Sequence, residues 1–163
     1  MEAKLERRGR NAVILEHPEG AHTDSDITVF FGRSDVIAAG DLFDMTKYPF
    51  IDEKRGGSIN GILKVLNHIS VDIAVPKQNE EGGTYIVPGR GRVSDRYDVA
   101  IYRDMLTIIR DRIQDLVKKG MSLEEVKSAK PTYDCDGEFG TDSGPWTTDM
   151  FVEAVYREMK KAK

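Results

Sequence analysis

The pattern of apolar and polar positions along the chain predicts strands first and helices later. Three short segments at 11–17, 27–31 and 35–39 are rich in β-branched and aromatic residues, and turn residues separate them. The second and third are continuously apolar instead of alternating, which is typical of strands covered on both faces. Two more strands are expected at 71–75 and 84–87, and each ends at a proline, which cannot donate to a strand ladder.

Apolar residues at spacings of three and four predict the helices. A helix over 58–69 has a single apolar stripe and a serine at its start that can cap it. The longest expected helix covers 95–119. A capping box at 122–125 starts a short helix, and Thr147 or Thr148 opens the last one.

Strands that alternate with helices in this order predict a layered α/β fold, with one mixed sheet and helices mainly on one of its faces. The stretch 40–57 has no clear period and is expected to be a long loop. The other face of the sheet has no expected cover within the chain. We divide the sequence into a basic N-terminal tail, 1–10, and a single domain, 11–163.

Composition narrows the classes of function. The chain has 163 residues and a net charge of −4, which argues for one globular domain and against a nucleic-acid surface. It contains neither a membrane-length apolar run nor a signal peptide, so we expect a cytoplasmic protein without membrane contacts. Cys135 is the only cysteine, which excludes an internal disulfide and a cysteine-based zinc cluster. Any metal site therefore depends on His, Asp and Glu, and the histidines are His17, His22 and His68.

Three polar segments follow expected strands, where sites of layered α/β folds are built. They are Ala21–Asp26 after the first strand, Gly40–Phe43 after the third and Pro88–Gly91 after the fifth. The first contains the imidazole of His22 and the second the carboxylate of Asp41, and zinc accepts both groups as ligands.

With their order and surroundings, these segments resemble the C-terminal half of the metallo-β-lactamase-fold hydrolases, over about 17–161. In that family an AHT or GHT motif, a strand ending in GD and a PGHG turn supply the later ligands of a two-zinc site. The resemblance implies that His22 is a ligand of the first zinc and that Asp41 bridges both. It also implies half of an αββα sandwich. The segments 57–66 and 146–151 and the helix after Ser94 look like the same scaffold.

Two departures from the family pattern weaken the implied zinc site. The PGHG turn is Pro88-Gly89-Arg90-Gly91 here, and a protonated guanidinium has no lone pair to give to a metal. The family's HxHxDH cluster does not occur before His22. A catalytic zinc needs about three protein ligands and an open position for water, whereas this chain offers two. Zinc is therefore expected at low occupancy at most.

Two readings of Arg90 stay open. Its charge can replace the missing metal and pair with Asp41, or its side chain can point into solvent. Asp24 lies close enough in sequence to His22 to orient the imidazole. We expect His68 to be a surface residue or a partner of a helix dipole, and His17 to serve its turn.

The resulting expectation is a metallo-β-lactamase-like module with an incomplete zinc site that is not catalytic alone and binds a partner. The partner is a second copy of the chain, or a separate chain carrying the N-terminal half, because the uncovered sheet face exceeds what monomers normally expose. The alternative is a zinc-dependent hydrolase of esters, lactams or phosphoesters, with ligands completed by another chain or with a reduced mononuclear site. The sequence does not identify the substrate.

Overall fold

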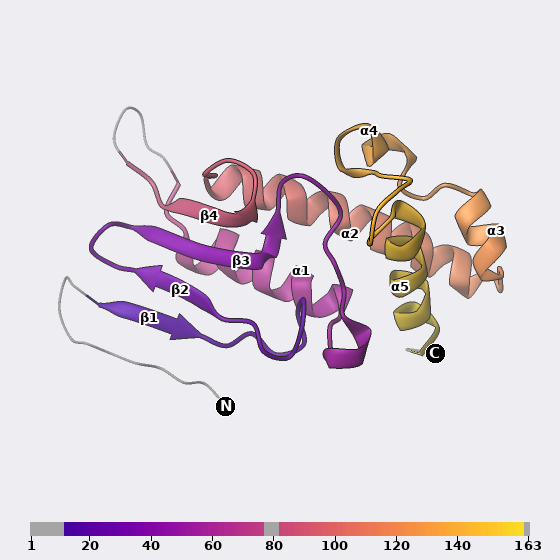
Figure 1. The fold of residues 1–163 in the computed structure, drawn as a ribbon, viewed down its shortest axis with the longest axis horizontal. Helices are drawn as coiled ribbons and strands as arrows, with labels where there is room; N and C mark the ends of the chain where they lie inside the picture. Colours follow the sequence, from indigo (N-terminus) through magenta and orange to yellow (C-terminus); the bar gives the residue numbers. More distant parts are fainter. Residues whose placement is uncertain (1–11, 77–81, 162–163) are drawn as a thin grey trace.

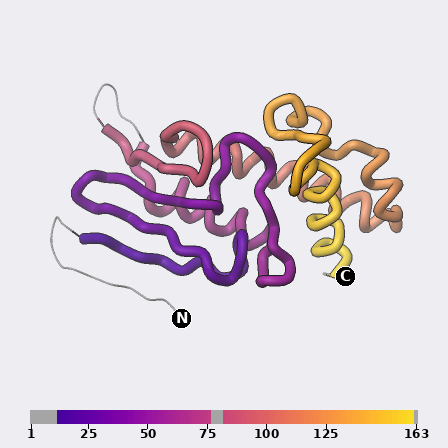
Figure 2. The backbone as a smooth tube through the Cα atoms, viewed as in Figure 1, coloured from indigo at the N-terminus to yellow at the C-terminus, as the bar shows by residue number. Residues whose placement is uncertain are grey.

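A computed structural model describes residues 12–76 and 82–161. The sheet occupies one end of the molecule and the last three helices the other, with the long helix α2 reaching from one to the other (Figure 1). The tube in Figure 2 follows the same path, from the indigo strands to the yellow C-terminal helix. The expected basic tail at 1–10 lies outside the described residues.

The four strands form one mixed sheet in the order β1-β2-β3-β4. They are β1 (Val13–Glu16), β2 (Thr28–Phe31), β3 (Val36–Asp44) and β4 (Tyr85–Arg90). The first three strands are antiparallel neighbours, whereas β3 and β4 run parallel. The mixed sheet expected from the sequence is confirmed.

The α-helices are α1 (Ile59–Asn67), α2 (Arg96–Lys118), α3 (Leu123–Ser128), α4 (Asp136–Phe139) and α5 (Thr148–Lys161). Short 3-10 turns lie at Glu53–Arg55 and Tyr133–Cys135. The expected caps are present. Ser58 accepts a hydrogen bond from the Gly61 amide at 3.1 Å, and Ser122 and Glu125 form both bonds of a capping box.

One expected strand is wrong. Residues 71–75 do not join the sheet, because α1 continues into a wide π-helical turn, His68–Ile73. The core side chain of Ile69 and the buried Ser70 hold this turn, and the Ser70 hydroxyl donates to the Leu66 carbonyl at 2.7 Å. This local bond and the packing of the turn against α2 outweigh the strand preference of the β-branched residues.

The expected loop at 40–57 is also shorter than predicted, because β3 continues to Asp44. Its pairing with β4 is irregular, with shifts of register after Ala38 and after Gly40. Pro88 lies inside β4 instead of ending it. A proline is tolerated there because β4 is an edge strand of the sheet.

The core lies between one face of the sheet and the helices. Ile37 and Ala39 of β3 and Ile86 of β4 are buried in the same cluster as the inward sides of α1, α2 and α5. Helix α1 contacts β3, and α2 packs against both α1 and α5. In Figure 1, α1 and α2 lie behind the sheet. Among the described residues, no helix is long and apolar enough to cross a membrane.

On the opposite face, the part of the sheet that is paired across all four strands carries only apolar side chains and tyrosine. The strand registers place one row across all four strands and a second row beside it. We call these eight residues the open face: Val13, Phe31, Val36 and Tyr85 in the first row, and Leu15, Val29, Ala38 and Val87 in the second. None of them is fully buried, and Tyr85 is 57% exposed. The sheet therefore has helices on one face and no cover from the described residues on the other, as the apolar strands predict.

Candidate functional site

The segment that carries His22 lies between β1 and β2 and is fixed by the loop before α1. The His22 carbonyl accepts a hydrogen bond from the Asp52 amide at 3.0 Å, and the Ala21 carbonyl accepts one from the Ser58 amide at 2.8 Å. Gly57 lies so close that a Cβ at that position would be 2.3 Å from the His22 carbonyl oxygen. The site loop thus requires a residue without a side chain at position 57.

Asp26 orients the imidazole of His22. Its Oδ1 lies 3.1 Å from Nδ1 of His22, while its other oxygen accepts a hydrogen bond from the Thr23 amide at 2.6 Å. Both side chains are largely buried, at 16% and 12% exposed. The imidazole Nε2 has no hydrogen-bond partner among residues 12–76 and 82–161. The sequence suggested Asp24 for this role. Instead, Asp24 acts through its backbone, where its carbonyl lies 2.8 Å from Nε2 of His17.

An aromatic row that the sequence analysis missed extends from His22. The ring of Phe50 lies 5.5 Å from the imidazole, and the indole of Trp146 packs edge-on against Phe50 at 4.7 Å. The Trp146 Nε1 donor is buried and has no acceptor among the described residues. Because Phe50 and Trp146 are far apart in the chain and lie in segments without a period, no local pattern indicates that they meet.

Asp41 and Arg90 lie on the paired strands β3 and β4, but they do not interact. The residue of β4 that lies beside the Asp41 side chain is Gly89, where an added Cβ would be 2.9 Å from the Asp41 carboxylate. Arg90 is instead in register with Asp44, whose buried carboxylate accepts hydrogen bonds from the amide and hydroxyl of Thr46 at 2.8 and 2.6 Å.

No ion pair or hydrogen bond joins Arg90 to Asp41 in the described part of the chain, so the first of the two readings of Arg90, a pairing with Asp41, is not formed. The irregular register of the two strands explains this result, because it sets Arg90 opposite a carboxylate that already has local donors. Both Asp41 and Arg90 are exposed. The alternative reading, in which Arg90 points into solvent, agrees with its exposure.

These residues do not fit a catalytic zinc ion. Within residues 12–76 and 82–161, no group of three or more His, Cys, Asp or Glu side chains is arranged to hold a metal. His22 and Asp41 offer two groups, and the guanidinium of Arg90 has no lone pair to give to a metal.

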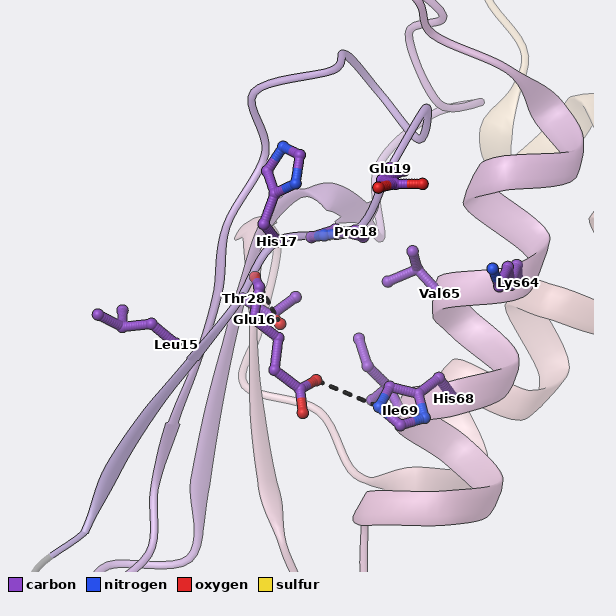
Figure 3. A pocket seen from close by; sticks show the side chains of 10 residues that line it. All are labelled: Leu15, Glu16, His17, Pro18, Glu19, Thr28, Lys64, Val65, His68 and Ile69. Atoms are coloured by element: carbon purple, nitrogen blue, oxygen red, sulfur yellow. Dashed lines mark hydrogen bonds and ion pairs between the residues drawn. The ribbon is translucent and has the colours of Figure 1, made fainter. Parts of the chain in front are cut away.

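A cavity of about 510 Å³ lies away from these residues, between β1 and α1 (Figure 3). The buried side chains of Val65 and Ile69 line it, and Glu16 reaches across from β1 to Nε2 of His68 at 3.2 Å. The other nitrogen of His68 lies 2.8 Å from Asp72. The hydrogen bond to Asp72 and the charge of Glu16 raise the pKa of His68 against the opposing effect of burial. The His68 side chain is 46% exposed, as expected for a surface residue. Its contacts nevertheless join β1 to the helical turn after α1.

The comparisons with known proteins show similarity in structure only. No protein-family model matches the sequence, and no curated protein matches it. Among solved structures, the stereoselective inverting sec-alkylsulfatase Pisa1 from Pseudomonas sp. is similar with a TM-score of 0.63 and 16% identity over 97% of this chain. A double mutant of this sulfatase gives a TM-score of 0.62 and 13% identity over 90% of the chain.

A metallo-β-lactamase from Pontibacter korlensis has a TM-score of 0.48 and 14% identity. The match covers 66% of this chain and 46% of the lactamase chain. The chain spans about a quarter of the sulfatases' length, 24% and 26% in the two structures. At these identities the similarity concerns the fold alone. It agrees with the partial fold expected from the His22, Asp41 and Pro88–Gly91 motifs. The chain has part of the metallo-β-lactamase fold.

Proposed function

We propose that this chain is a metallo-β-lactamase-like module that does not hydrolyse substrates on its own and acts by binding a second chain. The observation that carries the proposal is the residue at the expected third ligand position, Arg90, beside only two retained ligand types, His22 and Asp41. A guanidinium cannot donate a lone pair, and its charge repels a divalent cation. Two protein ligands are too few to hold a zinc ion that activates water.

A metal analysis of the purified protein tests this proposal. We expect the wild type to contain well below one zinc per chain after dialysis against a zinc-containing buffer. Arg90→His should raise the zinc content because it restores an imidazole at the strand end. Arg92→His is the matched control. Arg92 lies in the same turn, where it forms an ion pair with Asp98 at 2.6 Å, so this change should leave the zinc content unaltered.

The decisive measurement is made on the wild type. If it holds about one zinc per chain and hydrolyses a generic ester, lactam or phosphoester, the proposal fails. A His22→Ala variant purified in the same way should then lose that hydrolysis, which distinguishes a real site from a contaminating enzyme.

One observation favours a second candidate function, a zinc hydrolase completed by another chain. The Nδ1 atom of His22 is hydrogen-bonded to Asp26, which leaves Nε2 open, and histidine ligands are usually oriented in this way by a carboxylate. Asp41 also has no hydrogen-bond or ion-pair partner among the described residues. Under this alternative, zinc binds only after a partner is added, and His22→Ala removes the zinc from the complex.

A further inference from the structure

We propose that the cavity between β1 and α1 binds a free α-amino acid with a large apolar side chain. The volume of about 510 Å³ lies within the range of about 300–1,000 Å³ that is usual for small-molecule sites. His22, Asp41 and Arg90 do not line this cavity, so its occupancy is independent of the proposed function.

The cavity exists because the sheet presents polar side chains to an apolar part of the helix layer. Glu16 of β1 and Thr28 of β2 are partners in the antiparallel register, and both line the cavity. Opposite them, Val65 and Ile69 point from α1 and the turn after it toward the sheet (Figure 3). A carboxylate cannot be buried against such side chains without a polar partner. The two layers therefore stay apart at this edge of the sheet.

The inner wall of the cavity combines apolar surface with one available hydroxyl group. Val65, Ile69 and Thr28 are all buried in the fold. The Thr28 hydroxyl lies 3.5 Å from the Glu16 carbonyl, which is longer than the usual range of about 2.5–3.0 Å for such a bond. An apolar group placed against Val65 and Ile69 leaves water, and the Thr28 hydroxyl remains able to donate to a ligand oxygen.

The two sides of the cavity carry opposite charges that are not fully paired. On the β1 side, Glu16 contacts Nε2 of His68 through Oε2, and its Oε1 has no partner among the described residues. On the α1 side, the Lys64 ammonium forms no hydrogen bond or ion pair with any residue in the described ranges. The cavity thus offers one carboxylate oxygen and one ammonium group to a ligand.

These charges select a zwitterion. A ligand with only a carboxylate would meet the like charge of Glu16, and a ligand with only an ammonium would meet that of Lys64. An α-amino acid carries both groups on one carbon, so its ammonium can pair with Glu16 and its carboxylate with Lys64. Its side chain then contacts the apolar wall of Val65 and Ile69. Because such a ligand is small, we expect a dissociation constant of roughly 10 μM to 1 mM.

An NMR titration with L-leucine, L-phenylalanine and three compounds related to leucine tests the proposal. Isocaproate lacks the ammonium of leucine, isopentylamine lacks its carboxylate, and glycine lacks its side chain. We expect the two apolar amino acids to shift the signals of Glu16, Val65 and Ile69 to saturation. The methyl signals of Val29, on the open face, should not move. Each of the other three compounds should bind at least about tenfold more weakly than L-leucine.

Two substitutions separate the roles of the charged groups. Lys64→Gln should weaken the binding of L-leucine about three- to tenfold and strengthen that of isopentylamine. Glu16→Gln should also weaken L-leucine, but it should strengthen isocaproate. Because each variant gains one ligand as it loses another, damage to the fold cannot produce this result. Lys54→Gln, in the exposed part of the turn Glu53–Arg55, is the matched control and should leave all affinities unchanged.

Three results would overturn the proposal. The first is that neither amino acid shifts the signals of Val65 and Ile69 at concentrations up to about 10 mM. The second is that isocaproate, isopentylamine or glycine binds the wild type as tightly as L-leucine does. The third is that Lys54→Gln weakens the binding of L-leucine as much as Lys64→Gln does.

Discussion

His68 connects the edge strand to the helix layer through charged contacts. Its two ring nitrogens face Glu16 of β1 and Asp72 of its own helical turn, and Lys64 of α1 also lines the cavity beside it (Figure 3). The hydrogen bond to Asp72 has the largest effect on the raised pKa of His68. The protonated form is therefore favoured in the folded chain, which links its stability to pH.

The sign of this linkage gives a prediction. Because the folded-state pKa of His68 lies above the ordinary value of about 6.5, its contribution to stability is complete below that pH and disappears as the pH rises through the folded pKa. We expect His68→Gln to lower the urea midpoint at about pH 5.5 and to have little effect at about pH 9. An NMR titration of His68 should show a lower midpoint in Asp72→Asn. Equal destabilisation at both pH values would contradict this account.

At the site, the sequence indicates which residue types are present but not how they meet. The AHT, GD and PGRG segments pointed to His22, Asp41 and Arg90, which lie in the connection between β1 and β2, within β3 and at the end of β4. They did not indicate that Asp26 holds the imidazole, because Asp24 and Asp26 are both within reach along the chain. The register shift that moves Arg90 away from Asp41 is a property of two strands more than 40 residues apart, and no local pattern determines it.

The N-terminus of α1 shows how one element anchors another. Besides Ser58, the carboxylate of Glu158 on α5 accepts hydrogen bonds from the amides of Ile59 and Asn60 at 2.7 and 3.3 Å. A negative charge at this end of a helix also interacts favourably with its dipole. The contact fixes the C-terminal helix to the helix that supports the sheet.

We expect Glu158→Gln to destabilise the fold by about 1–3 kcal/mol, because it removes a charged acceptor from backbone donors. Urea unfolding followed by circular dichroism measures this difference. Glu138→Gln, on the exposed part of α4, is the control and should change the stability by less than about 0.5 kcal/mol. An equal effect of both substitutions would show that the cap is unimportant.

An element can be predicted from the sequence when local contacts determine it and not when distant segments do. Helices with strong stripes and caps, such as α1, α2 and α5, are determined locally and were predicted to within a few residues. Residues 71–75 are apolar and β-branched, but neighbouring helices hold the preceding turn, to which the Arg96 side chain donates at the Ser70 carbonyl. Contacts between distant segments thus decide the elements that lack a clear local signal.

At the scale of the whole molecule, helices of the described residues cover only one face of the sheet. Helices bury Ile37, Ala39 and Ile86 on one face of the sheet, whereas the open face keeps its apolar side chains accessible. The solved sulfatases that share this fold are about four times longer than the matched segment, so in those chains it is accompanied by much more protein. Under the proposed function, binding of another chain would add a second layer on the open face.

If the second chain of the proposed function is another copy of this one, thermal stability depends on protein concentration, because a partner that binds only the folded state shifts the unfolding equilibrium. A tenfold rise in concentration above the dissociation constant corresponds to about 1.4 kcal/mol per dimer, or about 0.7 kcal/mol per chain. For a chain of this size we expect the calorimetric midpoint to rise by roughly 2 °C per tenfold increase. Ile101→Ser, which changes an exposed side chain of α2 outside the open face, should keep this slope and Phe31→Lys should remove it. A wild-type midpoint that is reversible and independent of concentration would mean that the open face remains exposed to water in solution.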